Sequence, residues 1–136
     1  MGRDRRDPTR AISLAECRQH LRKANEYLQS ARAALEDDAA DACAGNSVLA
    51  TINATDAVAG ALIGERWQGP HDRAATHVMR AGEEGRAVAV HLRRVLRWKT
   101  RAHYDAAPVP PVEAAALLKA AERAVVIAER VVAARA

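Results

Sequence analysis

The arginine-rich segment between residues 86 and 104 contains the residues of this sequence best suited to chemistry with an anion. It reads RAVAVHLRRVLRWKTRAHY, and no acidic residue occurs between Glu84 and Asp105. A helix here, at about 100° per residue, places five arginines in one wedge opposite an apolar face. Such a face is either a solvated surface or a ridge that binds phosphates. The predicted polyanion-binding residues are Arg86, Arg93, Arg94, Arg97 and Arg101.

Two further basic residues lie on the other flank of the same segment. Lys99 and His103 are four residues apart, on the side of Leu96. A lysine on an apolar flank must extend to solvent or find a carboxylate. Asp56 lies toward the apolar side of its own predicted helix and would need a partner if it were buried. The sequence therefore predicts a buried polar pair between Asp56 and Lys99.

The helices that must position these residues are marked by capping and turn signals. Ser13 and Glu16 form the S-x-x-E pattern of a capping box, which predicts that the first helix starts there. Apolar and small residues then recur at spacings of three and four, as in a helical bundle. Further helices are predicted at 42–66, with Asp41 as a candidate cap, and at 72–80, 86–104 and 111–132. The seam of the first helix is Leu14, Cys17, Leu21, Ala24, Leu28, Ala31 and Leu35.

These signals predict an all-α fold, an antiparallel bundle of four to five helices in a single domain over residues 13–134. Residues 1–12 interleave arginine with aspartate and predict a charged, flexible tail. The chain has 136 residues, of which 49% are hydrophobic and only 3% aromatic. Much of the hydrophobic fraction is alanine. A core so poor in large side chains favours close helix packing, and it favours a second subunit that completes the burial.

One stripe of the predicted 42–66 helix contains only small and amide side chains, and two interpretations of it stay open. Small residues let another backbone approach closely, either inside the chain or at a dimer seam. Its asparagines would form internal hydrogen bonds or contact a ligand. The stripe consists of Cys43, Asn46, Ala50, Asn53, Ala57, Gly60 and Gly64.

Composition excludes several classes of protein. The net charge of +4 is compatible with an anionic partner. The N-terminus has no apolar signal-peptide region and no run approaches the ~18 apolar residues of a membrane span, so a cytoplasmic protein is expected. Cys17 and Cys43 form no CxxC motif. His71 and His77, with Asp72, are wrongly spaced for one helix face, so neither a metal nor another cofactor is expected.

The order of the helices and the segment LRWKTRAHYD, residues 96–105, resemble the HEPN superfamily of helical bundles. The resemblance covers residues 13–132. Members are often encoded beside minimal nucleotidyltransferases, and active members resemble metal-independent ribonucleases that carry R-x(4–6)-H. In those members the arginine and histidine of two subunits meet at a dimer interface. Arg97 and His103 match that motif with five intervening residues.

A second HEPN signature, R-x-x-A-D-Y, gives a different alignment of the same segment. Aligned on Tyr104, it places Lys99 at the arginine position and His103 at the aspartate position. The catalytic residues that the resemblance implies are Arg97, His103 and Tyr104. In an active enzyme His103 would be the general acid and base for attack of a 2′-OH on the adjacent phosphate. Arg97 or Arg101 would stabilise the developing negative charge.

The arginine face and the resemblance together predict a HEPN-like binding or regulatory module that is not catalytic and forms a homodimer. Its basic helix would contact RNA, a nucleotide or an acidic partner protein, of which a nucleotidyltransferase-type protein is one. The first alternative is a HEPN ribonuclease acting as the toxin of a toxin–antitoxin pair. The second alternative is a structural helical adaptor that binds no polyanion.

Overall fold

The computed structural model describes residues 8–135, and most of these residues are helical. The all-α prediction is confirmed there, apart from one antiparallel sheet of two short strands. In chain order the described elements are β1 (Thr9–Ala11), α1 (Leu14–Glu36), α2 (Ala40–Ile63), β2 (Glu65–Trp67), the 3-10 turn η1 (His71–Arg73), α3 (Ala74–Met79), α4 (Glu83–Leu96), α5 (Lys99–His103) and α6 (Pro111–Arg135).

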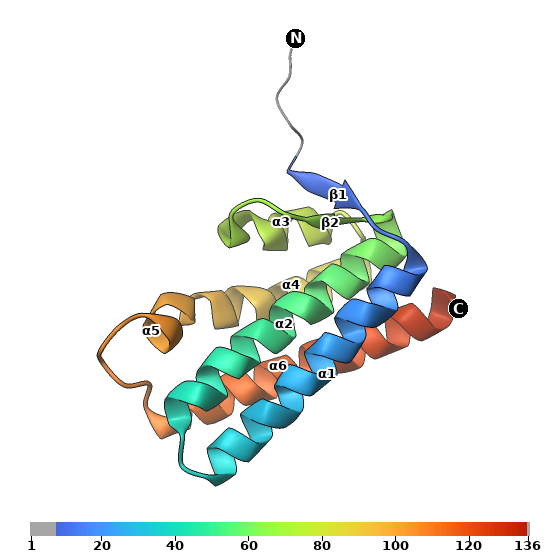
Figure 1. Cartoon of the computed structure of the whole chain (residues 1–136). Helices are drawn as coiled ribbons and strands as arrows, with labels where there is room; N and C mark the ends of the chain where they lie inside the picture. The colour runs from blue at the N-terminus through green and yellow to red at the C-terminus, as the bar shows by residue number, and fades with distance from the viewer. Residues whose placement is uncertain (1–7, 136) are drawn as a thin grey trace.

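The long helices α1, α2, α4 and α6 alternate in direction along the chain (Figure 1). A tight turn at residues 37–39 reverses the chain between α1 and α2. The helices α2 and α6 run the same way, since contacts join both their starts and their ends. Near the starts, Cys43 Sγ lies 3.7 Å from the carbonyl oxygen of Ala114. Near the ends, Arg135 Nε donates to the carbonyl oxygen of Ala61 at 2.9 Å.

The first helix begins as its capping box predicts. Ser13 Oγ accepts from the Glu16 amide at 3.1 Å, and Glu16 Oε1 accepts from the Ser13 amide at 2.9 Å. These bonds satisfy two backbone donors that a helix N-terminus otherwise leaves free. The predicted seam is confirmed as the inner face of α1, because its central residues are buried and its other members pack against the core. The buried members are Cys17, Ala24, Leu28 and Ala31.

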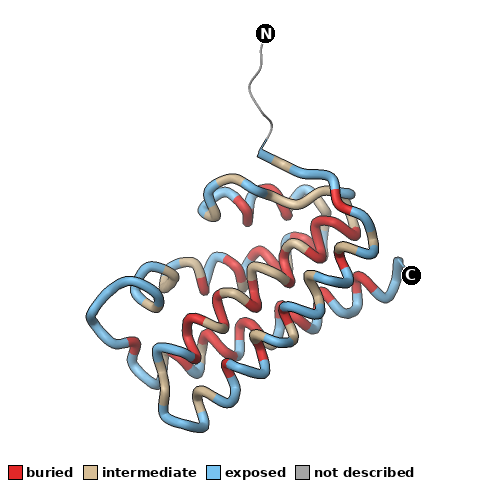
Figure 2. The backbone as a smooth tube through the Cα atoms, viewed as in Figure 1, coloured by how far each residue is buried: buried red, intermediate tan, exposed pale blue. Residues whose placement is uncertain are grey.

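The core follows α2, whose buried residues run along nearly its whole length (Figure 2). Most of these residues are alanine, glycine, serine or threonine, so neighbouring backbones pack closely. A Cβ added at Gly60 would collide with Cys17 Sγ and Ile12 Cδ1. Asn53 Oδ1 lies 3.0 Å from the ring Nδ1 of His20 in α1, from which it can accept a hydrogen bond. The small-residue stripe therefore packs against α1 at Asn53 and Gly60, and against α6 at Cys43.

The two strands correct the predicted extent of the tail. Residues 9–11, placed in a flexible tail by the sequence, form β1 and pair with β2 in the register Thr9↔Trp67 and Ala11↔Glu65. Gly64 ends α2 in the left-handed region, at φ 75°, and turns the following residues back along β1. The amide of Ile12 then donates to the Gly64 carbonyl at 3.1 Å. Residues 1–7 of the predicted tail lie outside the described residues.

Asp41 has a different role from the predicted helix cap. The N-cap residue of α2 is Ala39, and its side chain makes no capping hydrogen bond. Asp41 Oδ1 instead accepts from the Val109 amide at 2.7 Å. Because Val109 is buried just before α6, this bond ties the proline-rich linker to the first turn of α2. The region predicted as one helix at 72–80 is divided into η1 and α3.

Gly85 is the position where an added methyl group should do most damage to the fold. A Cβ there would collide with the backbone carbonyl of Val78, which cannot move as a flexible side chain can. Gly85→Ala should therefore lower the free energy of unfolding by about 3 kcal/mol, despite the ~1 kcal/mol that alanine gains in helix propensity. Urea denaturation measures the difference. Val90→Ala, at an exposed position of the same helix, should change stability by less than about 0.5 kcal/mol; equal stability of Gly85→Ala and wild type would contradict the packing described here.

Candidate functional site

The arginine-rich segment forms two helices rather than the single predicted helix at 86–104. The helix α4 ends at Leu96, and Trp98, at φ −106° and ψ 0°, leaves the helical region before α5 begins. The Trp98 amide donates to the Val95 carbonyl at 3.0 Å, which tightens the last turn. The break lets α5 contact α2, and Leu96, Trp98 and Ala102 pack against the core. Burial of these apolar residues is the physical reason that the helix does not continue straight.

All five predicted arginines are exposed, and they divide between α4 and the α5 region. Arg94 forms an ion pair with Glu113 of α6 at 3.3 Å. Among residues 8–135 this is the only ion pair formed by any of the five. The guanidinium of Arg93 lies 3.3 Å from Met79 Sδ. One of the five arginines, Arg94, therefore has an acidic neighbour, which another helix supplies.

Arg101 is held in place by an aromatic ring. Its Cζ lies 5.1 Å from the centroid of the Trp98 ring, in cation–π contact, and Nη2 lies 3.5 Å from the Pro108 carbonyl. The ring thus covers one side of the guanidinium while its outer side stays exposed. Arg101 is therefore a partly preorganised cation, and forming an ion pair with it costs less side-chain entropy than with a free arginine.

His103 packs on α2 through a glycine that sequence reasoning did not single out. A Cβ at Gly45 would lie 3.1 Å from His103 Cε1, so the absent side chain makes room for the imidazole. Together with Asp41 and Asn46 these residues line a shallow hollow of about 230 Å³. The Tyr104 ring lies 6.0 Å from the His103 ring and is 77% exposed. A glycine inside a helix costs about 1 kcal/mol, which is the sequence signal that could have marked Gly45.

The two residues of the R-x5-H motif lie on either side of the helix break. Arg97 directly precedes Trp98 at the end of α4, whereas His103 ends α5. Within residues 8–135 no hydrogen bond or ion pair joins Arg97 to His103. Their meeting across two subunits, as the HEPN resemblance implies, stays a prediction.

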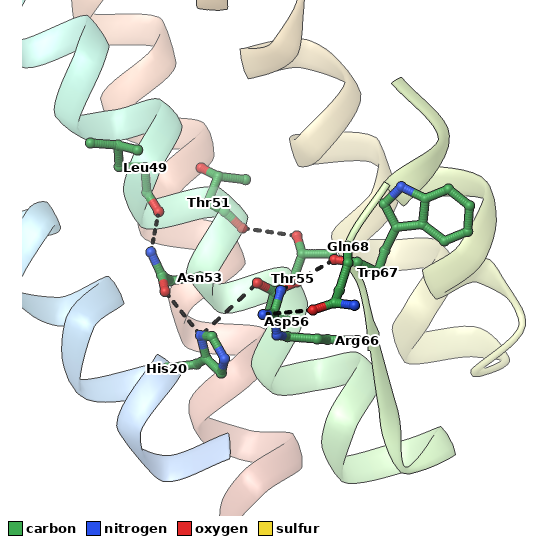
Figure 3. Close-up of polar contacts among 9 residues, drawn as sticks. All are labelled: His20, Leu49, Thr51, Asn53, Thr55, Asp56, Arg66, Trp67 and Gln68. Atoms are coloured by element: carbon green, nitrogen blue, oxygen red, sulfur yellow. Dashed lines mark hydrogen bonds and ion pairs between the residues drawn. The ribbon is translucent and has the colours of Figure 1, made fainter. Parts of the chain in front are cut away.

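Asp56 and Lys99 do not form the predicted pair. Asp56 Oδ2 lies 4.0 Å from His20 Nδ1 of α1, and the Arg66 side chain lies on its other side (Figure 3). Burial raises the pKa of Asp56 to about 7, against the opposing charge of Arg66. Lys99 lies near His71 instead, where burial and then the lysine charge lower the pKa of that histidine. The break before α5 redirects Lys99 away from the flank on which the pairing was based.

Other features of the described residues bear on the kind of site. Within residues 8–135, none of the helices is long and apolar enough to cross a bilayer. In residues 8–135 no group of three His, Cys, Asp or Glu side chains is placed to hold a metal ion. Both cysteines are buried and free.

No protein-family model matches this chain, and no curated protein matches it in sequence. The HEPN resemblance rests on residues 96–105 and on the helix order, and it remains a prediction. The exposed basic and aromatic side chains of α4 and the α5 region are the best candidates for a functional surface. We define this α4–α5 surface as Arg86, Arg93, Arg97, Arg101, His103 and Tyr104.

Proposed function

We propose that this chain is a HEPN-like helical-bundle module that binds single-stranded RNA through the α4–α5 surface and does not cleave it. The observation that carries the proposal is the cationic, aromatic surface itself. Its four arginines are exposed, and none has a carboxylate at ion-pair distance among residues 8–135. Exposed arginines without acidic neighbours attract phosphates and release their counterions, which is the main source of affinity for nucleic acids.

The aromatic residues favour a single strand over a duplex or an acidic protein. Tyr104 presents an exposed ring three residues after Arg101, whose guanidinium is already in cation–π contact with Trp98. Unpaired bases stack on such rings and on guanidinium planes, whereas the bases of a duplex are hidden from them. An acidic protein would use the charges but would gain little from the exposed ring.

The HEPN ribonuclease is the second candidate, and the exposure of His103 favours it. The imidazole ends α5 two residues after Arg101, within reach of a strand bound along the arginines. Cleavage would need a cation beside that imidazole to stabilise the transition state. Among residues 8–135 Arg97 forms no hydrogen bond or ion pair with it, so an active site would require a homodimer, in which a second copy supplies the arginine.

A binding assay in EDTA separates these functions. Labelled single-stranded RNA is mixed with the full chain at several salt concentrations, and both anisotropy and RNA integrity are followed. The proposal predicts binding that weakens steeply with salt while the RNA stays intact. Cleavage that disappears in His103→Ala would replace the proposal with the ribonuclease. A chain that neither binds nor cleaves RNA at about 50 mM salt would contradict both and would favour a structural adaptor.

Tyr104→Ala should weaken RNA binding by removing a stacking platform. One base–aromatic stack contributes about 1–3 kcal/mol, so the dissociation constant should rise by roughly tenfold. The salt dependence should stay the same, because no phosphate contact is lost. Val112→Ala removes another exposed apolar side chain, 80% exposed at the start of α6, and should leave the affinity unchanged. An unaltered affinity in Tyr104→Ala would exclude the ring from the interface.

A further inference from the structure

A pocket with room for a small molecule lies away from the α4–α5 surface. It has a volume of about 460 Å³ and lies where the β1–β2 sheet faces η1 and α3. No residue of the α4–α5 surface lines it. Pockets of about 300–1,000 Å³ are the usual size for small-molecule sites. Its lining residues are Thr9, Trp67, Arg73, Thr76, His77 and Arg80.

A buried histidine, His77, lines this pocket, and its ring is held by a hydrogen bond. The His77 side chain is 3% exposed, and its Nε2 lies 3.0 Å from Glu65 Oε2. Arg80 Nη1 lies 3.6 Å from the same carboxylate oxygen. The carboxylate thus fixes the plane of the imidazole and also holds one arginine at the rim. The other ring nitrogen, Nδ1, has no hydrogen-bond partner among residues 8–135.

An aromatic wall completes the pocket. The Trp67 ring lies 5.5 Å from the His77 ring at an angle of 41°. The indole is fixed in turn, because its Nε1 donates to the Pro70 carbonyl at 2.8 Å. Gly69 packs against this ring, and a Cβ there would lie 2.9 Å from Trp67 Cζ2. Trp67 is partly buried and packs against the edge of the core.

The side chains that line the pocket are suited to a ligand with a flat ring and an acid group. The Trp67 and His77 rings offer surfaces for stacking. Arg73 and Arg80 at the rim are both exposed, and guanidinium groups bind carboxylate and phosphate oxygens through paired hydrogen bonds. The hydroxyls of the two threonines can orient polar ring atoms.

We propose that this pocket binds a small aromatic anion, with its ring against Trp67 and His77 and its acid group between Arg73 and Arg80. Mononucleotides and aromatic carboxylates share this chemistry. The site is independent of RNA binding at the α4–α5 surface, since no residue belongs to both.

The fluorescence of Trp67 tests the proposal. The chain has two tryptophans, so Trp98→Phe leaves Trp67 as the sole reporter. Two probes that do not fluoresce like tryptophan, adenosine 5′-monophosphate and nicotinate, are each titrated into this variant alongside their uncharged counterparts, adenosine and nicotinamide. We expect a saturable change with at least one acid, and at least tenfold weaker binding of its uncharged counterpart. The acid that binds identifies which kind of anion the site prefers.

Arginine variants locate the site. The double variant Arg73→Gln with Arg80→Gln should bind the acidic probe at least tenfold more weakly, while its thermal unfolding transition stays cooperative. The double variant Arg97→Gln with Arg101→Gln, made in the same background, should leave the affinity for the acidic probe unchanged. Three results would overturn the proposal: no saturable change with either acid, equal binding of the uncharged counterparts, or loss of binding in the second double variant and not in the first.

Discussion

Replacing Arg97 and Arg101 together with glutamine is expected to weaken the binding of single-stranded RNA roughly 50-fold at about 50 mM salt. Arg97 directly precedes Trp98 at the helix break, and the Arg101 guanidinium lies over the Trp98 ring. Both arginines are exposed, and neither has a carboxylate partner among residues 8–135. Each phosphate contact to a single strand contributes about 0.7 to the slope of log affinity against log salt. Losing two contacts should therefore also reduce that slope by about 1.4. Anisotropy titrations at four or more salt concentrations measure both quantities.

Two control variants separate position from charge. Arg18→Gln with Arg22→Gln removes the same net charge from the exposed face of α1 and should leave the slope almost unchanged. Arg97→Lys with Arg101→Lys keeps the charge but loses the planar guanidinium, so the slope should persist while the affinity falls modestly. Equal losses in the α1 and α4–α5 variants would mean that RNA responds only to net charge, and the proposed interface would be wrong.

Replacing Asp56 with asparagine is expected to change how stability depends on pH. A carboxyl group whose pKa is raised in the folded state contributes stability that is complete below its unfolded pKa and is lost as pH rises through the folded pKa. For Asp56 that interval runs from the ordinary value of 3.8 to about 7. A shift of about three units corresponds to at most about 4 kcal/mol. Wild-type stability should therefore fall toward alkaline pH, and Asp56→Asn should be the more stable protein there.

The surroundings of Asp56 explain why the neutral form is favoured. The carboxyl group is largely desolvated between α1 and α2, next to His20 and Cys17 of α1, with Arg66 of β2 as the main stabilising charge. The Arg66 guanidinium is shared, since it also lies 3.5 Å from the Trp67 carbonyl and from Gln68 Oε1 (Figure 3). One divided charge does not offset the cost of burying a carboxylate.

Urea denaturation at a series of pH values from about 4 to 9 tests the Asp56 prediction. The two unfolding free energies should be similar near pH 4, should separate as pH rises from about 4 to 7, and should differ by a constant amount above that interval. Asp37→Asn, in the exposed turn after α1, is the matched control and should follow the wild-type profile. Parallel profiles for wild type and Asp56→Asn would show that Asp56 does not titrate in the proposed range.

The sequence predicted the elements that depend on local signals. The capping box at Ser13 and Glu16, the seam of α1 and the proline start of α6 are each determined within a turn of the residues that mark them. The all-α class followed from the same signals. Helix periodicity is strong where a long helix has one buried face, and α1 and α6 are such helices.

Features that depend on contacts between residues far apart in the chain were not predicted from the sequence. The break at Trp98 forms because α5 gains contact with α2. The helical pattern of residues 86–104 alone predicts one continuous helix and holds no information about that contact. That error also led to the pairing of Lys99 with Asp56. The strands β1 and β2 have three residues each, too few for an alternating pattern to be seen. The hollow beside His103 depends on Gly45, which lies 58 residues earlier in the chain.

We expect RNA to contact the α4–α5 surface, and an NMR titration of the isotope-labelled full chain with a short single-stranded RNA in EDTA measures that contact residue by residue. The largest shifts are expected for the amides of residues 97–104, for the side chains of Arg97 and Arg101 and for the ring of Tyr104. Residues of α1 that face away from this surface should stay unperturbed. Shifts concentrated on α1, or no shifts at low salt, would contradict the claim.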